Sequence, residues 1–102
     1  MSSPELPVAL TRAARRDLRD IEAYTLRRWD TRQWASYEEA LARALAALGD
    51  NPGLGRARDD LRPGYRAHVV EQHLILYRVT ATAVVVARIL HGRQDARRAP
   101  RG

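Results

Sequence analysis

The chain has 102 residues and no Cys, and its formal net charge is +6. This length fits a single domain spanning 1–102, and the missing Cys excludes disulfide and thiolate chemistry. All 18 basic residues are Arg, which suits an anionic protein or nucleic-acid partner, although GC-rich coding would produce the same composition. The N-terminus has neither the basic start of a signal peptide nor an apolar run of membrane-spanning length. We therefore expect a cytoplasmic protein.

Two amphipathic helices are predicted in the first half of the chain. Residues 6–10 form a short apolar run with a Pro near its start, which is typical of an edge strand. Thr11 can cap a helix running from Arg12 to about Trp29, and Asp30 can cap a second helix that ends at 49–53. The apolar stripe of the second helix comprises Trp34, Tyr37, Leu41, Ala44 and Leu48. The face of the first helix predicted to meet solvent comprises Arg15, Arg16, Asp17, Arg19, Asp20 and Glu22. Helices joined by so few residues should form an antiparallel hairpin.

The second half of the chain predicts a small sheet. Residues 54–60 are expected to form a loop, and the Arg-rich tail from about residue 96 is expected to be mobile. The predicted strands are Tyr65–Val70, His73–Val79 and the Val-rich Ala83–Leu90, which should be central. Glu71-Gln72 would connect the first two, although it lacks the Gly or Asn that such turns favour. The sequence therefore predicts an α+β fold of order β-α-α-β-β-β. The N-terminal strand should lie at an edge, and the two-helix hairpin should pack on one face of a small, mostly antiparallel sheet.

Catalytic and metal-binding motifs are scarce in this sequence. His68, His73 and His91 are scattered, with no carboxylate at helical ligand spacing, so a zinc site is not predicted. Ser occurs at three positions, none of them with a visible base partner, and no Gly-rich phosphate-binding loop is present. We expect no metal, no cofactor and no clear catalytic residue.

A basic cluster is the strongest candidate for chemistry on RNA. Its members are Arg66, Arg78, Arg88, His91 and Arg93. Gathered at one end or on one face of the sheet, they could bind a phosphate and move a proton. The favoured interpretation is plainer: Arg78 and Arg88 border a solvated face, and His91 ends a strand.

Aromatic residues gather where the two helices meet. Trp29, Trp34 and Tyr37 could anchor a protein partner, because aromatic and Arg residues are common interface anchors. Alternatively, Trp34 and Tyr37 fill the core of the hairpin. Trp29, at the end of its helix, is the better candidate for exposure.

Several segments occur together in a characteristic order. They are Ala14…Asp17-Leu18…Ile21…Tyr24, Trp29 with the stripe after it, Asn51-Pro52…Gly55, Leu61-Arg62-Pro63-Gly64-Tyr65-Arg66, Tyr77-Arg78-Val79 and Arg88-Ile89-Leu90-His91-Gly92-Arg93-Gln94-Asp95. Through them the chain resembles the ParE toxins of the RelE/ParE superfamily, from about Val8 to Asp95. No single segment is specific, but their order and spacing together are.

The resemblance implies a toxin of a type II toxin–antitoxin module that inhibits growth, commonly through DNA gyrase, without a catalytic site. A ParD-like antitoxin would neutralise it in a hetero-oligomer and would supply the only contact with DNA; no membrane partner is expected. The target-binding candidates are Arg88, His91, Arg93 and Asp95. The antitoxin-binding candidates are Trp29, Tyr37, Arg66 and Arg78.

Two alternatives stay open at this point. The superfamily also contains RelE-like ribosome-dependent mRNA endoribonucleases, for which the candidate residues here are Arg66, Arg78, Arg88 and His91. This chain departs from their pattern, because Gly92 follows His91 and Lys is absent. A non-toxic scaffold that keeps the fold is the other alternative. Instead of binding a target, His91 and Asp95 could be a structural pair that closes the sheet.

Overall fold

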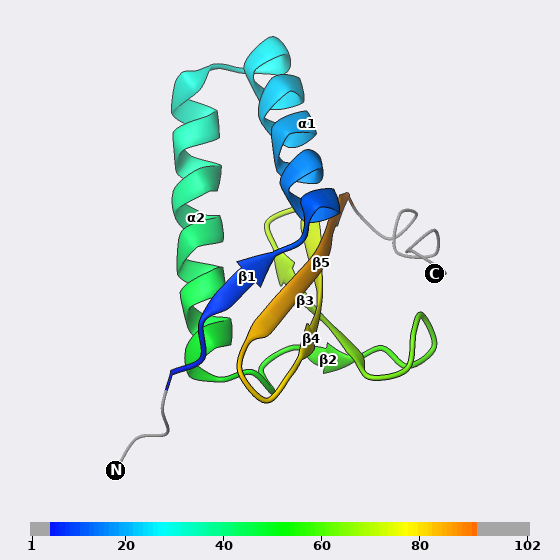
Figure 1. Ribbon diagram of the computed structural model, residues 1–102. Coiled ribbons are helices and arrows are strands. Elements are labelled where there is room, and N and C mark those ends of the chain that lie inside the picture. Colours follow the sequence, from blue (N-terminus) through cyan, green and yellow to red (C-terminus); the bar gives the residue numbers. More distant parts are fainter. Residues whose placement is uncertain (1–4, 92–102) are drawn as a thin grey trace.

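The computed structural model describes residues 5–91, in which a helical hairpin packs on one face of a single sheet (Figure 1). In chain order the elements are β1 (Val8–Leu10), α1 (Arg12–Arg28), α2 (Thr31–Asp50), β2 (Arg56–Ala57), β3 (Tyr65–Val70), β4 (His73–Val79) and β5 (Val84–His91). The strand order is β1-β5-β4-β3-β2; β1 runs parallel to β5, and the other neighbours are antiparallel. The predicted α+β architecture is confirmed, with β1 at one edge and the Val-rich β5 flanked on both sides.

The helix boundaries follow from local capping, as the sequence predicts. The Thr11 hydroxyl accepts a hydrogen bond from the Ala14 N–H at 3.1 Å, and the Asp30 carboxylate accepts one from the Gln33 N–H at 2.8 Å. Each cap satisfies one of the N–H groups that the first turn of a helix leaves without a partner. The described residues contain no helix both long and apolar enough to cross a membrane.

The main core lies between the hairpin and the sheet. The largest fully buried side chains that the helices cover are Leu48, Ile75, Tyr77, Val84 and Val86. A second, smaller cluster forms on the opposite face of the sheet, called the far face below. There Leu76 and Leu90 are buried against the partly buried Leu61 and Tyr65. The sheet is therefore apolar on both faces around the central strands, which explains the continuous apolar runs of β4 and β5.

The segment predicted as a loop, 54–60, contains a short strand that sequence analysis missed. Arg56 and Ala57 pair with Ala67 and Arg66 of β3 as β2. Two residues are too few to show any alternation of polar and apolar side chains, so the prediction of a plain loop was wrong here.

Tyr77 holds the loop between α2 and β2. Its buried hydroxyl donates to the Pro52 carbonyl at 2.7 Å and accepts from the Gly55 N–H at 2.8 Å. A Cβ atom at Gly55 would lie 2.6 Å from the Tyr77 hydroxyl oxygen, so this close approach requires Gly. The Arg66 guanidinium adds a hydrogen bond to the Gly55 carbonyl at 2.9 Å. The loop is therefore fastened to the helix side of the sheet.

The connection between β3 and β4 is strained at one residue. Glu71 has φ of 56°, in the left-handed region that side chains with a Cβ disfavour. The two-residue connection expected at Glu71-Gln72 is confirmed, since Val70 and His73 pair directly across it.

Replacing this residue with Gly should stabilise the fold. We expect Glu71→Gly to raise the free energy of unfolding by about 0.5–1 kcal/mol, because relief of strain exceeds the entropy that Gly adds to the unfolded chain. Denaturant titration measures the change. Gln72→Gly is the matched control: Glu71 is the one non-Gly residue of 5–91 with positive φ, so the control should not stabilise. Equal stabilisation by both variants would contradict the assignment of strain to Glu71.

Candidate functional site

The sheet divides the four candidate nuclease residues between its two faces. Directly opposite residues on neighbouring strands share a face. Arg66 lies opposite Tyr77, whose side chain is in the helix-side core. His91 lies opposite His73, whose ring contacts Tyr37 of α2 with centroids 5.0 Å apart. Arg66 and His91 are therefore both on the helix side.

Arg78 and Arg88 lie on the far face. Arg78 is opposite Tyr65, and Arg88 is opposite Leu76; both partners belong to the far-face cluster. The Arg88 guanidinium, however, reaches the edge of β5, where it contacts Asp17 of α1 and lines one hollow with His91. The sheet therefore separates Arg78 from Arg66 and His91, but not Arg88 from His91. The four side chains are not brought together around one phosphate position.

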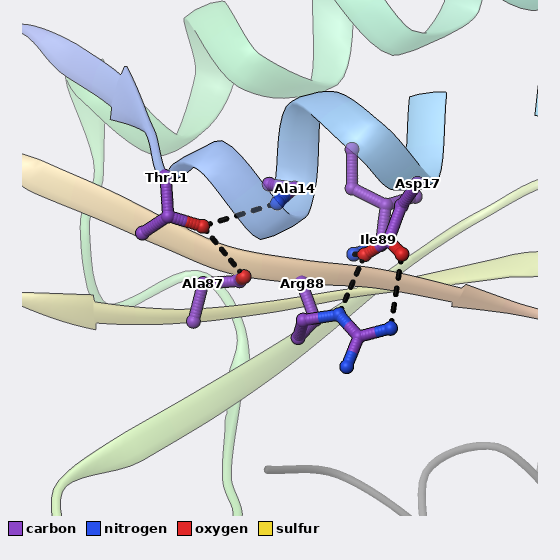
Figure 2. Close-up of polar contacts among 6 residues, drawn as sticks. All are labelled: Thr11, Ala14, Asp17, Ala87, Arg88 and Ile89. Atoms are coloured by element: carbon purple, nitrogen blue, oxygen red, sulfur yellow. Dashed lines mark hydrogen bonds and ion pairs between the residues drawn. The ribbon is translucent and has the colours of Figure 1, made fainter. Parts of the chain in front are cut away.

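Two of these arginines also have structural contacts. Arg66 donates to the carbonyls of Gly55 and Gly53, at 2.9 and 3.3 Å, on the loop before β2. Arg88 donates from Nε and an Nη atom to both carboxylate oxygens of Asp17, at 2.8 and 2.9 Å (Figure 2). These contacts fix both guanidinium groups in place.

Asp17 is a residue whose role sequence analysis missed. Its carboxylate also accepts the Ile89 N–H at 2.9 Å, and only 12% of its side chain is exposed. The prediction that Asp17 belongs to the solvent face of α1 was wrong. One local signal could have predicted this position. Asp17 follows the fully buried Ala14 by three residues, so both side chains lie on the same face of α1.

Thr11 forms a second link between the start of α1 and β5. Besides capping the helix, its hydroxyl donates to the Ala87 carbonyl at 2.8 Å (Figure 2). Together with the Asp17–Arg88 pair, this bond fixes α1 along β5. The far end of α1 is thereby held in a set position relative to the end of β5.

A cavity of about 660 Å³ opens between the far end of the hairpin and the β3–β4 turn. We call it the hairpin groove. Its lining includes Asp20, Tyr24, Arg28, Trp29, Tyr37, Glu71, His73 and His91. Trp29 is 65% exposed and Tyr24 is 53% exposed. Large exposed aromatic side chains beside a groove indicate a binding surface rather than a core.

Three rings form the inner part of this groove. The rings of Tyr37, His73 and His91 lie edge to face in series, with centroid separations of 5.0 and 5.2 Å. Trp34 packs on the other side of Tyr37 at 5.8 Å and belongs to the hairpin core. Trp29 is exposed, as its place at the end of its helix suggested, and Tyr37 is buried, as the alternative interpretation held.

The Tyr37 hydroxyl is buried without a hydrogen-bond partner among residues 5–91. Burial, and then the nearby Glu71 carboxylate, raise the pKa of Tyr37 from 10.0 to about 12. Both effects disfavour the phenolate. At neutral pH this group is therefore a neutral, buried hydroxyl without a partner among the described residues, carried by a residue that lines the groove.

The raised pKa predicts a loss of stability in alkali. Above pH 10 the unfolded chain releases the Tyr37 proton while the folded chain keeps it, so the free energy of unfolding falls as pH rises toward 12. We expect wild type to lose roughly 1–2 kcal/mol more than Tyr37→Phe across this window. Denaturant titrations at pH 9 and pH 11.5 measure the difference. Parallel losses in the two proteins would contradict the assignment.

The remaining candidates have simpler outcomes. Arg93, Asp95 and the tail from 96 lie outside the described residues. Within 5–91, no group of three or more His, Asp or Glu side chains is arranged to hold a metal ion. The site that the described residues build is thus a groove with mixed charge and exposed aromatics.

The family model for the ParE toxin of the type II toxin–antitoxin system parDE matches residues 8–96. The chain belongs to the ParE toxin family. Toxin ParE1 of Caulobacter vibrioides is 36% identical over 91 residues, which cover 89% of this chain and 94% of that protein. Toxin ParE1 of Mycobacterium tuberculosis is 39% identical over 90 residues, covering 87% and 92%. Like the family model, these two relatives match most of the chain.

Solved structures resemble this ParE-family fold as well. A chain of the chromosomal ParDE toxin–antitoxin system from P. aeruginosa superposes with a TM-score of 0.76. It is 19% identical, and the match covers 89% of this chain and all of that one. A chain of the RelBE2 toxin–antitoxin complex from Mycobacterium tuberculosis matches with a TM-score of 0.55 at 26% identity, covering 85% and 91%. The fold is shared by structures from both named toxin–antitoxin systems.

Proposed function

We propose that this ParE-family chain inhibits growth by poisoning DNA gyrase and is neutralised by a ParD-like antitoxin in a hetero-oligomer. In this proposal it acts by binding proteins and reaches DNA only through the antitoxin. The observation that carries the proposal is the separation of the arginines by the sheet. Arg78 lies on the far face and Arg66 on the helix side, beside the loop before β2, and the Arg88 guanidinium is held at the edge of β5 by Asp17 of α1.

This separation argues against the mRNA endoribonuclease. Cleavage of RNA needs an acid–base group and phosphate-binding groups around one scissile bond. Here Arg88 is held by Asp17 and Arg66 by the loop carbonyls. Rearranging them would break contacts that hold α1 and the loop before β2.

The exposed aromatic residues of the hairpin groove support the proposal that a protein partner binds there. Trp29 and Tyr24 are exposed at the hairpin end, and buried aromatic anchors dominate many interfaces. Among the antitoxin-binding candidates, Trp29 and Tyr37 line this groove, whereas Arg66 and Arg78 lie elsewhere. We therefore assign antitoxin binding to the groove and restrict the antitoxin candidates to Trp29 and Tyr37.

The target candidates among the described residues, Arg88 and His91, both lie in the C-terminal half of β5. Both also line a shallower hollow of about 340 Å³ beside α1. That placement supports contact with the target at the end of β5 toward the C-terminus. His91 also lines the hairpin groove, so the proposed target and antitoxin surfaces meet at this residue.

Purified gyrase tests the proposal. We expect the purified chain to inhibit supercoiling and to stabilise cleavage complexes, and a ParD-like protein, the candidate antitoxin, to relieve both effects. No effect on supercoiling or cleavage at saturating protein would contradict gyrase as the target. Codon-positioned mRNA cuts on translating ribosomes that His91→Ala abolishes would instead favour the nuclease. Harmless expression without the candidate antitoxin would favour a scaffold.

A further inference from the structure

Acidic groups prevail in the hairpin groove of a chain whose net charge is +6. Asp20 on α1 and Glu71 on the β3–β4 turn line it, whereas Arg28 is the single arginine among its described lining residues. The described lining therefore carries two carboxylates and one guanidinium. The charge of this groove is therefore opposite in sign to that of the whole protein, and electrostatic attraction here favours a cation.

A hydroxyl group at the inner end of the groove has no hydrogen-bond partner among the described residues. The side chain of Tyr37 is 94% buried, since its exposure is 6%, and its hydroxyl has no partner within 5–91. A buried hydroxyl without a partner is costly, and a ligand group that satisfies it gains affinity. Glu71 acts electrostatically on the same hydroxyl. A donor that carries positive charge would satisfy both groups at once, whereas a carboxylate would be repelled by Glu71.

The outer end of the groove also suits a cation. Trp29 and Tyr24 expose their rings there. A guanidinium or ammonium group is attracted to the face of such rings, most strongly for Trp. The long apolar stem of Arg or Lys would contact the rings while its charged head reaches the carboxylate.

The strained backbone of Glu71 fits a binding role. A positive φ at a non-Gly residue lowers stability, and residues held in this way cluster at ligand-binding sites. Glu is disfavoured in the left-handed conformation of this turn, but its carboxylate is the group that a basic ligand would contact.

We propose that the hairpin groove receives a basic side chain, Arg or Lys, from the antitoxin, held by Glu71, the Tyr37 hydroxyl and the rings of Trp29 and Tyr24. This inference rests on the proposed function, because it takes the antitoxin as the occupant. It adds a specific charge pairing: a positive group of the partner enters an acidic groove on a basic toxin.

Titration calorimetry with the purified candidate antitoxin tests this pairing. Glu71→Gln removes the charge and keeps the size of the side chain, and we expect it to weaken binding about tenfold. Glu38→Gln on α2 is the matched control, since Glu38 is exposed and does not line the groove; it should change affinity less than about twofold. Thermal unfolding of both variants checks that the fold is kept.

Charge reversal identifies the basic residue of the partner. Glu71→Arg should weaken binding further, and changing one Arg or Lys of the candidate antitoxin to Glu should restore it in that background alone. Unchanged affinity in Glu71→Gln, with wild type binding normally, would overturn the inference and leave antitoxin binding standing. Rescue by no single partner residue would overturn it as well. Absence of binding by wild type would contradict the proposed function itself, and the inference with it.

Discussion

Leu41→Asp is expected to remove a large part of the stability of the fold. Leu41 lies on the face of α2 that packs on the sheet and is 5% exposed, within the main core. A carboxylate there would be buried without a partner in a cavity shaped for Leu, which costs more than about 4 kcal/mol. Domains of this size have only about 5–15 kcal/mol of stability to lose.

Ala42→Asp is the matched control, because Ala42 is the next residue along α2 and is exposed. It should cost less than about 1 kcal/mol, mostly from helix propensity. Circular dichroism with denaturant titration measures both variants. A Leu41→Asp protein as stable as the Ala42→Asp protein would contradict the packing of α2 on the sheet.

Asp17→Ala should be the second most damaging substitution. It removes a bidentate ion pair and leaves the Arg88 guanidinium, which cannot neutralise itself, largely covered and without this carboxylate. It also removes the acceptor of the Ile89 N–H. Because Arg88 is 30% exposed and keeps some hydration, we expect a loss of about 2–3 kcal/mol rather than the larger values of fully buried pairs.

Two further variants test this explanation. Asp20→Ala, one turn along α1 at an exposed position, should change the free energy of unfolding by less than about 0.5 kcal/mol. The double variant Asp17→Ala/Arg88→Met should recover part of the loss, since no charge is then left behind. Strict additivity of the two single substitutions in the double variant would contradict a direct coupling between Asp17 and Arg88.

The helices could be predicted almost to the residue because their signals are local. Thr11 and Asp30 cap them through bonds that span three residues, and the apolar stripe repeats within each turn. The strands of the hairpin β3–β4 and the Val-rich β5 were predicted for the same reason. Their composition and their turns are properties of neighbouring residues.

The contacts that create the site could not be predicted in this way. Asp17 and Arg88 are 71 residues apart in the chain, and nothing near either residue identifies the other. The face of the sheet on which each arginine lies depends on strand register, including a register shift at Leu76/Tyr77. The four basic residues that the sequence pattern groups are therefore not gathered at one place, since Arg66 and Arg78 lie on opposite faces of the sheet.

The acidic residue of the hairpin groove could not be predicted from the sequence either. Trp29 could be predicted to be exposed from its place at the end of a helix, but Glu71 looked like an ordinary turn residue. Its position beside Tyr37 arises only when the β3–β4 turn meets the hairpin. The prediction of aromatic partner anchors was therefore available from the sequence, whereas the acidic group beside them was not.

Hydrogen exchange of the complex with the candidate antitoxin tests most directly whether the hairpin groove binds a protein. Backbone amides of free and bound toxin would be compared by mass spectrometry. The account predicts new protection at Tyr24–Trp29 and at the β3–β4 turn, with little change in the far-face residues around Tyr65 and Arg78. Protection confined to the far face, with the groove amides exchanging as in the free protein, would contradict it.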